Sequence, residues 1–354
     1  MFRLSYIMVA KPPYFTVIIV TYNSGAYLYE CINALNQQTF KDFEVIIFDN
    51  GTEDGSVDSI SSKNLSINII KSTLNKGFAF GNNAAVKDAN GDWLILLNAD
   101  AIPQSDWLQE ICKAICRYPE IVIFGSTQIN YHNPEVLDGA GDHYHPFGLA
   151  WRGAKGYPAD SIAGDAIVMG PCAAAAIYKK DIFKKLGGMA EHFFCYYEDV
   201  DLALRFRLEG HLCIQLVNAR VKHVGSATLG CNSDFVRYYV GRNKVWTFFR
   251  CLPGALLILL LPGFFTVILI RLCLAIGFGG SRIRLRAVWD ALYRLPEVWG
   301  ERRCIQSRRK IGVVQFGQSM TWSIGKLLMR SSDGRSIPKS VRVNSIGKAD
   351  ACNS

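Results

Sequence analysis

The sequence predicts an α/β fold built on a mostly parallel sheet, and three observations support this prediction. Between residues 15 and 125, short apolar runs alternate with helix-like segments, as in successive βαβ units. The apolar runs lack the polar alternation of a strand with one wet face, so helices are expected to cover both faces of the sheet. Half of the 354 residues are hydrophobic, which is enough to bury a large core.

Each expected element has its own segment. FTVIIV (15–20) is a continuous apolar run and is the first expected strand, and SGAYLYECINALNQQ (24–38) has the pattern of the helix that follows it. The other expected strands are 43–49, 67–71, 93–100, 121–125 and a small-residue run at 166–178, and the other expected helices are 78–89 and 105–118.

Residues 130–165 interrupt this pattern with glycine, proline, histidine and aromatic residues. Long irregular segments inside compact domains are often functional loops. We therefore expect this segment to contribute to a binding site, although it contains no readable substrate code.

The positive charge is concentrated after the most hydrophobic part of the chain. Residues 281–354 contain 15 Lys and Arg but 5 Asp and Glu, whereas the whole chain carries a net charge of +9, so the preceding residues are close to neutral. This layout favours an anionic membrane surface over a nucleic-acid partner.

The 11 cysteines include no CxxC pair, which argues against a zinc site or a disulfide framework. Residues 1–14 form an N-terminal lead in which we recognise no signal peptide.

Residues 251–280 are almost wholly apolar, and GALLILLLPGFFTVILI (254–270) is near the lower limit for one membrane span. Pro262-Gly263 falls in its middle. This predicts either a hairpin that enters the membrane and returns or helices that lie in the interface, and a pair of soluble core helices is the alternative.

Four polar clusters follow the expected strands, at residues 20–23, 48–56, 74–83 and 97–100. Ligands of parallel α/β sheets bind at the carboxyl ends of the strands, although ordinary turn chemistry explains any single cluster. These four clusters contain few Lys or Arg residues, and Lys76 is the exception. A phosphate-binding site without many basic residues usually depends on a divalent cation. Asp100, at the end of a strand, is the natural ligand for such a cation.

The stretch HFFCYYEDVDLALRFRLEGH (192–211) places Glu198 and Asp199 side by side after several aromatic residues, with Asp201 just beyond. Acids at a helix start can act as caps, and Asp201 fits that role. A cap does not need the preceding doublet, so one of these two carboxylates is a candidate general base.

Residues 15–250 resemble family 2 glycosyltransferases, and most of all their rhamnosyltransferase-like bacterial branch. VIIVTYNSGAYLYECINALNQQTFKDFEVIIFDNGTEDGS is similar to the opening signature of the family, NKGFAFGNN and LNAD to its next two motifs, and YYEDVDLALRFRLEG to its ED motif. The resemblance implies a GT-A fold, a nucleotide-sugar donor, a divalent cation (Mg²⁺ or Mn²⁺) and an inverting mechanism.

The resemblance also implies roles for individual residues. Asp100, in a DxD-like motif whose first acid is Asn98, matches a metal ligand, and His223 matches a further ligand. Asp199 matches the base. Glu198 is the alternative for that role and is otherwise expected to orient the acceptor or the surroundings of Asp199. The remaining matches concern the nucleotide-sugar: Thr21, Tyr22 and Asn23 at the nucleoside, Asp49 at the base or ribose, and Lys76, Asn98 and Arg242 around the donor. A helix-surface arginine beside the membrane is the alternative for Arg242.

Processive members of the family carry a QxxRW motif where this chain reads YYVGRNKVWTFFR (238–250), so transfer of a single sugar is expected. The resemblance implies a hexosyl- or deoxyhexosyltransferase that uses a dTDP-rhamnose or UDP-hexose type of donor. Its acceptor would be a glycan or a polyprenyl-linked sugar of cell-surface polysaccharide synthesis, at the cytoplasmic face of the inner membrane. An inactive carbohydrate- or lipid-binding scaffold and a sugar-nucleotide pyrophosphorylase are the alternative functions.

The chain is expected to divide into an N-terminal lead (1–14), a catalytic domain (15–250), a membrane-associated segment (251–280) and a basic tail (281–354).

Overall fold

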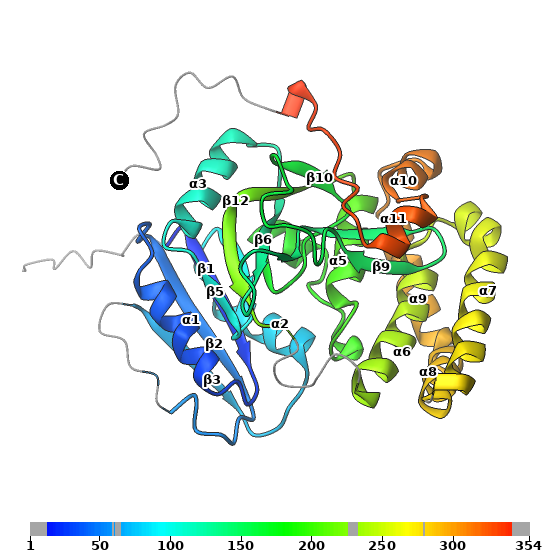
Figure 1. Cartoon of the computed structure of the whole chain (residues 1–354), viewed down its shortest axis with the longest axis horizontal. Helices are drawn as coiled ribbons and strands as arrows, with labels where there is room; N and C mark the ends of the chain where they lie inside the picture. The colour runs from blue at the N-terminus through cyan, green and yellow to red at the C-terminus, as the bar shows by residue number, and fades with distance from the viewer. Residues whose placement is uncertain (1–12, 59, 61–64, 226–232, 279, 342–354) are drawn as a thin grey trace, which may run out of the picture.

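The computed structural model describes residues 13–58, 60, 65–225, 233–278 and 280–341 (Figure 1). Most of the N-terminal lead and the last residues of the basic tail therefore lie outside the described residues. The strands are β1 Phe15–Thr21, β2 Phe43–Asn50, β3 Ile67–Ser72, β4 Trp93–Leu97, β5 Ala101–Pro103, β6 Ile123–Asn130, β7 Leu137–Gly139, β8 Asp142–His145, β9 Leu149–Arg152, β10 Ala166–Val168, β11 Ala175–Lys179 and β12 Cys213–His223. The helices are α1 Ala26–Asn36, α2 Phe78–Asp88, α3 Trp107–Arg117, α4 Lys180–Lys185, α5 Glu198–Leu208, α6 Asp234–Cys251, α7 Gly254–Phe278, α8 Ser281–Tyr293, α9 Leu295–Ser307, α10 Val313–Ser319 and α11 Ile324–Met329, with short 3₁₀ turns η1 Glu191–Phe193 and η2 Lys339–Val341.

The main sheet has the strand order β10-β12-β6-β11-β4-β1-β2-β3. β4, β1, β2 and β3 are mutually parallel, with Phe15 opposite both Phe43 and Trp93, which confirms the predicted βαβ half. β11 runs antiparallel between β4 and β6, so the second half of the sheet is mixed. The predicted strand 166–178 is in fact two short strands, β10 and β11, separated by a turn.

Helices cover both faces of the sheet, as the apolar strands predicted. Val17 and Ile19 of β1 belong to a core with α1 and α3, whereas Ile18 points to the opposite core, with α2 and α5. Successive side chains of a strand point to opposite faces, so one continuous apolar run serves both cores. The polar residues that follow the strands are thereby gathered at one edge.

The irregular segment 130–165 contains short strands. β7 pairs with β6, and β8 and β9 form a separate antiparallel hairpin. In Figure 1 the hairpin lies between the main sheet and the C-terminal helices. The segment therefore carries side chains to the carboxyl edge of the sheet.

Helices α6 to α11 gather at the end of the molecule away from β3 (Figure 1). The predicted membrane hairpin of residues 251–280 is wrong in one respect: α7 continues through Pro262, and the chain does not reverse there. A proline inside a helix removes one backbone hydrogen bond, but the peptide groups before and after it still pair within the helix. α7 is long and apolar enough to cross a membrane by length and composition alone, and 28% of its most apolar window is buried inside the protein.

The predicted basic tail is folded as far as Val341. Trp246 of α6 donates its indole N–H to the carbonyl of Ala291 in α8 at 3.0 Å, and Arg302 of α9 donates to the carbonyl of Phe249 at 2.7 Å. Gly241 of α6 lies directly against Ala287 of α8, so these small residues let α8 approach α6 closely. The high arginine content of the segment obscured this packing, because several of the arginines bind backbone carbonyl groups inside the protein.

Candidate active site

A pocket of about 500 Å³ lies at the carboxyl edge of the sheet, closed on one side by the residues that lead into α5. All four predicted polar clusters contribute to it. From these clusters the pocket is lined by Val20, Tyr22, Asn50, Asn75, Gly77, Phe78, Asn98, Ala99 and Asp100. Arg152, Cys172, Glu198 and Asp199 complete its polar wall.

Five of the residues predicted to bind the nucleotide-sugar are not among the lining residues, and four of these hold the loops around the pocket in place. Thr21 donates its hydroxyl to Ser24 at 2.9 Å. Buried Asp49 accepts the Thr52 N–H at 2.9 Å, and Asn23 accepts the Glu53 N–H at 2.9 Å. These bonds hold the loops after β1 and β2 together.

Lys76 is the fourth of these residues. Its backbone N–H donates to the side-chain carbonyl of Asn50 at 2.8 Å, and its ammonium group lies 4.8 Å from the centre of the Phe80 ring. Asn50 in turn donates to Asn75 at 2.9 Å. This network orders the loop before α2, and Asn50 and Asn75 are pocket residues that the sequence reasoning did not name.

Asp100 and His223 lie together, as the resemblance implied. Asp100 is placed by the turn after β4, and His223 is the last residue of β12, which pairs with β5 immediately after Asp100. Nε2 of His223 lies 3.5 Å from Oδ1 of Asp100 and 3.5 Å from Nδ2 of Asn98. The Gly225 N–H donates to Oδ2 of Asp100 at 3.2 Å.

Asp138 of β7 contacts the ring nitrogen of His223 that points away from Asp100. Its Oδ2 lies 2.7 Å from Nδ1 of His223, and it forms ion pairs with Arg152 and Lys155. Burial by itself would raise the pKa of Asp138, but the hydrogen bond to His223 and the charge of Arg152 outweigh it and lower the pKa far below its usual range. Asp138 is therefore ionised and can only accept, so Nδ1 of His223 carries the hydrogen.

This donor set fits a divalent cation. With its hydrogen on Nδ1, His223 would present the Nε2 lone pair to a cation beside Asp100. Burial alone lowers the pKa of His223, but the hydrogen bonds to Asp100 and Asp138 raise it above its usual value, so a bound cation would take the place of the proton on Nε2. A carboxylate oxygen and an imidazole nitrogen are ligands that Mn²⁺ and related cations accept.

Glu198 and Asp199 begin α5 and both line the pocket. Asp199 accepts the Ala173 N–H at 3.2 Å and the Val200 N–H at 2.8 Å. Glu198 is buried, and its Oε2 has no hydrogen-bond partner among the described residues. Burial and the neighbouring charge of Asp199 raise the pKa of Glu198 well above its usual value, which favours its protonated form. Of the two, Asp199 is the better proton acceptor.

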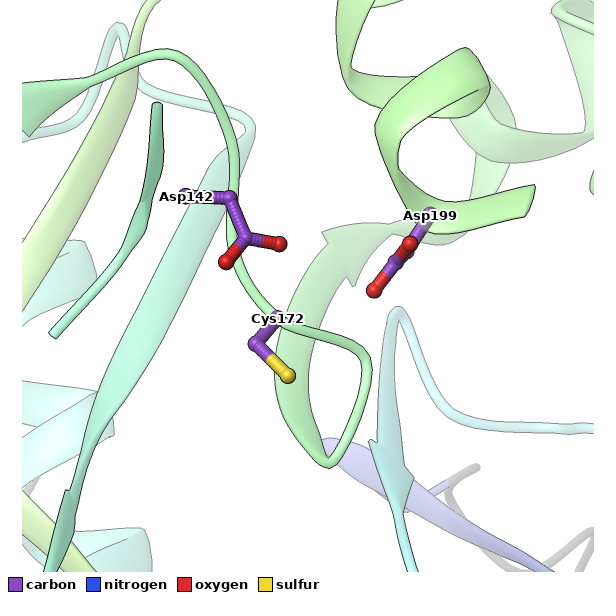
Figure 2. A group of neighbouring side chains, drawn as sticks. All are labelled: Asp142, Cys172 and Asp199. Atoms are coloured by element: carbon purple, nitrogen blue, oxygen red, sulfur yellow. The ribbon is translucent and has the colours of Figure 1, made fainter. Parts of the chain in front are cut away.

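Asp199 meets two groups from other elements, Asp142 of β8 and Cys172 of the loop after β10 (Figure 2). Their ligand atoms all lie within 4.8 Å of one another. Burial, followed by the charge of Asp199, raises the pKa of Asp142 to about 8, and burial raises the pKa of the Cys172 thiol to about 12. A protonated thiol is a poor metal ligand. The raised pKa of Asp142 favours a protonated carboxyl group there, which relieves the charge repulsion with Asp199.

The turn before α5 has an unusual backbone. Phe194, Tyr196 and Tyr197 all have φ between 66° and 69°, a region that residues other than glycine rarely occupy. Asn243 of α6 donates its amide hydrogens to the carbonyl groups of Phe193, Cys195 and Tyr196 at 2.7–2.9 Å. These bonds hold the turn that presents Glu198 and Asp199.

Arg242 supports the same turn and is not among the pocket-lining residues. It is buried, and its guanidinium group donates to the carbonyl groups of His192 and Phe193 at 3.0 Å. It also lies 4.2 Å from the ring centre of Trp246. Neither an exposed helix-surface position nor a place at the donor diphosphate matches this environment.

Asp201 is not the helix cap that the sequence suggested. α5 begins at Glu198, so Asp201 lies inside its first turn, fully buried. It accepts from Arg205 at 2.8 Å and from Arg250 of α6 at 2.8 Å. The ion pair between Asp201 and Arg205 follows from their spacing, because residues four positions apart lie on the same face of a helix. The ion pair between Asp201 and Arg250 depends on how α6 packs against α5.

The sequence reasoning missed Asp138, Asp142, Arg152 and Asn243. The first three lie in the segment 130–165, which was expected to be functional but offered no motif. Asn243 was visible as part of the Arg242-Asn243 pair, although nothing in the spacing indicated that it faces the turn before α5. These residues reach the site from β7, β8, β9 and α6.

Residues 16–187 match the model of a family described as "Glycosyl transferase family 2". A relative from Mycobacterium tuberculosis, N-acetylglucosaminyl-diphospho-decaprenol L-rhamnosyltransferase, is 24% identical over 234 residues, which cover 58% of this chain and 75% of the relative. The uncharacterized glycosyltransferase YfnE of Bacillus subtilis is 36% identical over 113 residues, 31% of this chain and 29% of YfnE. The matched region likewise spans 41% of glycosyltransferase GlyG of Streptococcus pneumoniae and thus less than half of either of these two proteins.

Solved structures share the fold. Residues 1–349 of S. aureus TarS in complex with UDP-GlcNAc match with a TM-score of 0.55 at 16% identity, over 90% of this chain and 93% of that one. The mannosyltransferase PcManGT from Pyrobaculum calidifontis, solved with GDP-Man and Mn²⁺, matches with a TM-score of 0.52 at 16% identity, over 87% of both chains. At such low identity these likenesses establish the GT-A type of fold and nothing beyond it.

Proposed function

Since residues 16–187 of this chain form a glycosyltransferase family 2 domain, we propose that the protein transfers one sugar, with inversion, from a nucleotide-sugar to a glycan or lipid-linked acceptor. The donor would be of the dTDP-rhamnose or UDP-hexose type, and the product would serve cell-surface polysaccharide synthesis. The 24% identical relative whose name describes rhamnosyl transfer to a diphospho-decaprenol-linked sugar supports this class of reaction.

One observation carries the proposal: Asp100 and Asp199 line the same pocket from different elements, the end of β4 and the start of α5. An inverting transfer needs positive charge at the leaving diphosphate and a carboxylate at the attacking hydroxyl. Asp100 and His223 would hold a divalent cation, which when bound would stabilise the charge of the leaving nucleotide. Asp199 would take the proton of the acceptor hydroxyl.

Asp142 gives Asp199 a partner in this step. With its pKa raised to about 8 by burial and by the charge of Asp199, Asp142 remains protonated near pH 7. Two carboxyl groups this close cannot easily both be ionised, so the proton on Asp142 allows Asp199 to remain the free carboxylate. Arg152, between Asp138 and this pair, adds positive charge that favours the ionised form of Asp199.

The protein would act at the cytoplasmic face of the inner membrane, with α7 lying along the surface. Leu256, Leu260, Phe264 and Ile268 are buried along one side of α7, and the Phe264 ring stacks on Phe248 of α6 at 3.9 Å between centres. The opposite side exposes Ile258, Leu259, Phe265, Leu269, Ile270, Leu274 and Ile276. A helix packed on the protein over most of its length is suited to an interfacial position rather than to a span surrounded by lipid.

A screen of nucleotide-sugars tests the proposal. Purified full-length protein is incubated with dTDP-rhamnose, UDP-glucose, UDP-galactose and UDP-galactofuranose in Mn²⁺ or Mg²⁺, and release of nucleotide is measured with and without chelator. We expect metal-dependent hydrolysis of one donor class, lost in Asp100→Ala. If the protein binds a nucleotide-sugar but releases no nucleotide from any donor, even with a membrane extract as acceptor, it is an inactive binding scaffold.

A further inference from the structure

Lys244 is a buried cation without an acidic partner, and the proton transfer described above does not use it. Its side chain on α6 is 5% exposed. Among the described residues, no carboxylate forms an ion pair with it, and the charged groups that act on it are both cations. A buried ammonium group is strongly unfavourable unless an anion neutralises it or it loses its proton.

Lys244 faces the junction of three helices. One turn before it, Gly241 lies against Ala287 of α8, so closely that a Cβ at Gly241 would be 3.1 Å from the Ala287 Cβ. One turn after it, Phe248 stacks on Phe264 of α7. Residues three and four positions apart share one side of a helix, so the Lys244 side chain lies where α6, α7 and α8 meet.

Two arginines from the other two helices lie at this junction. Arg284 of α8 donates to the backbone carbonyl of Arg271 in α7 at 3.3 Å. Burial, followed by the charges of Arg271 and Arg284, lowers the pKa of Lys244 to about 7. Neither arginine forms an ion pair with a described carboxylate, whereas Arg286 on the same helix lies 3.7 Å from Asp290. The junction therefore has three cationic groups for which the described chain supplies no anion.

The cationic cluster of Lys244, Arg271 and Arg284 adjoins the wall of the active-site pocket. Tyr197 lines the pocket, and its hydroxyl accepts the Ala150 N–H at 3.1 Å. The same hairpin packs on the helices of the cluster, since Gly148, two residues before Ala150, lies directly against Phe264 of α7 and Phe248 of α6. Tyr197 directly precedes Glu198, so the cluster lies behind the side of the pocket that holds the candidate base.

Exposed apolar side chains occupy the same two helices that supply the arginines. They are Leu269, Ile270 and Leu274 on α7 and Leu285, Trp289, Leu292 and Tyr293 on α8. An anion-binding group beside an exposed apolar surface matches a ligand that joins a charged head to a hydrocarbon chain.

We infer that Lys244, Arg271 and Arg284 bind the diphosphate of a lipid-linked sugar acceptor. Its hydrocarbon chain lies along the exposed sides of α7 and α8, and its sugar reaches the pocket past Tyr197. The guanidinium groups donate paired hydrogen bonds to phosphate oxygens, and Lys244 supplies a point charge from behind. The inference rests on the proposed glycosyl transfer, because it names the acceptor class of the same site.

Binding of farnesyl diphosphate to the full chain, measured by calorimetry, tests this inference. Chelator is present throughout, so that a metal-dependent donor site cannot hold the probe. Wild type is compared with Lys244→Met, with Arg284→Gln and with Arg286→Gln, the matched control that removes an exposed charge two residues away on α8. Farnesol and inorganic pyrophosphate separate the contributions of the chain and of the diphosphate.

We expect farnesyl diphosphate to bind wild type and Arg286→Gln alike, and to bind Lys244→Met and Arg284→Gln about tenfold more weakly or worse, because each loses a charge-assisted contact. Pyrophosphate should show the same dependence at lower affinity, and farnesol should show none. Lys244→Met should melt at or above the wild-type temperature without ligand, because it removes a buried charge. Equal affinity in all four proteins would overturn the inference.

Binding to phosphatidylcholine vesicles with and without phosphatidylglycerol tests whether the cluster binds the phosphate groups of bilayer lipids instead. If anionic vesicles bind in a manner that depends on Lys244 and Arg284 while farnesyl diphosphate does not compete, the cluster binds bilayer headgroups and the inference fails.

Donor hydrolysis in metal, measured on the same preparations, keeps the two proposals apart. Arg286→Gln should hydrolyse the donor normally, whereas Asp100→Ala should fail to hydrolyse it and still bind farnesyl diphosphate. A wild-type protein that binds the probe in this manner but hydrolyses no donor contradicts the proposed function and leaves the diphosphate site standing.

Discussion

Nδ1 of His223 lies 2.7 Å from Oδ2 of Asp138, on the side of the ring opposite Asp100. Asp138 and His223 are 85 residues apart in the chain and come from β7 and β12, which flank β6. The ionised carboxylate of Asp138 sets the tautomer of the imidazole, and the tautomer decides whether Nε2 can bind a cation. A residue outside every recognised motif thus prepares the proposed metal centre.

Asp138→Asn should raise the Mn²⁺ concentration needed for half-maximal donor hydrolysis by about 10–100-fold, because the amide no longer fixes the tautomer of His223. The measurement is a Mn²⁺ titration of nucleotide release. Asp160→Asn, which removes an exposed carboxylate from the same segment, is the control and should behave like wild type. An unchanged Mn²⁺ requirement in Asp138→Asn would contradict the role assigned to the Asp138 carboxylate.

Asp199→Asn should lose about 10²-fold or more in turnover, because the amide retains the shape but cannot accept the proton. Donor affinity, measured by calorimetry with the nucleoside diphosphate, should stay close to wild type. Glu198→Gln should lose much less, since burial and the charge of Asp199 favour the protonated form of Glu198, which glutamine resembles. The roles are reversed if Glu198→Gln is inactive while Asp199→Asn still turns over.

Turnover of the wild type should fall as the solution is acidified through the pKa of Asp199, because the base acts only when ionised. Burial raises this pKa above its usual value, so the loss should begin at a higher pH than for an exposed aspartate. Asp142→Asn should leave the acid limb of the pH–rate profile in place, because Asp142 is already neutral in the range where Asp199 titrates. An acid limb that moves to lower pH in Asp142→Asn would mean that Asp142 is ionised beside Asp199 and would contradict this protonation order.

Asp201→Asn should destabilise the protein by about 3–5 kcal/mol, because it leaves the buried guanidinium groups of Arg205 and Arg250 without their carboxylate. Urea unfolding monitored by tryptophan fluorescence measures this. Asp234→Asn, at the exposed start of α6, removes a comparable charge and should change stability by about 0.5 kcal/mol or less. A helix cap, in contrast, would tolerate asparagine at Asp201 almost without loss.

The pKa of Asp201 is lowered, since the charges of Arg250 and Arg205 outweigh the effect of burial. The stabilisation from these pairs is therefore present above the ordinary aspartate pKa near 4 and is lost as the pH falls through the lowered value. Wild type should accordingly lose more stability than Asp201→Asn on acidification in that range. Parallel stability curves of the two proteins would contradict the ion-pair assignment.

The wild-type protein should sediment with membranes, and replacing Leu269 and Ile270 by aspartate should move it to the soluble fraction, because both side chains are more than half exposed on α7. Tyr29→Asp, at an exposed position on α1, is the control. Protease added from the periplasmic side should not cleave the chain after Ser281. Cleavage there would mean that α7 crosses the membrane.

Local sequence patterns were sufficient for the first half of the fold. The apolar runs of β1 and β2 and the segments of α1 and α3 appear in the structure within a few residues of the expected bounds, because period and apolar run length are properties of a single segment. The polar edge of the sheet was predictable for a related reason, since the residues that follow parallel strands must all lie at the carboxyl edge of the sheet. Asp100 and Asp199 could thus be named from motifs that each lie within one short stretch.

Local patterns were misleading where a second element decides the environment. Asp201 looks like a cap in its own helix, yet Arg250 of α6 makes it a buried ion pair. Pro262 looks like a point of reversal, yet α7 continues through it while one side packs on α6. Spacing along the chain contains no information about either contact.

The sequence by itself therefore determined the βαβ half of the protein, the polar edge of its sheet and three carboxylates that face the pocket, Asp100, Glu198 and Asp199. Only the tertiary structure decided which distant groups tune them. Asp138 reaches His223, Asp142 reaches Asp199 and Asn243 holds the turn before α5, each from a different element. The physical reason is that strand and helix formation depends on neighbours along the chain, whereas pKa values, tautomers and metal ligation depend on neighbours in space, which the strand order and the packing of α6 bring together.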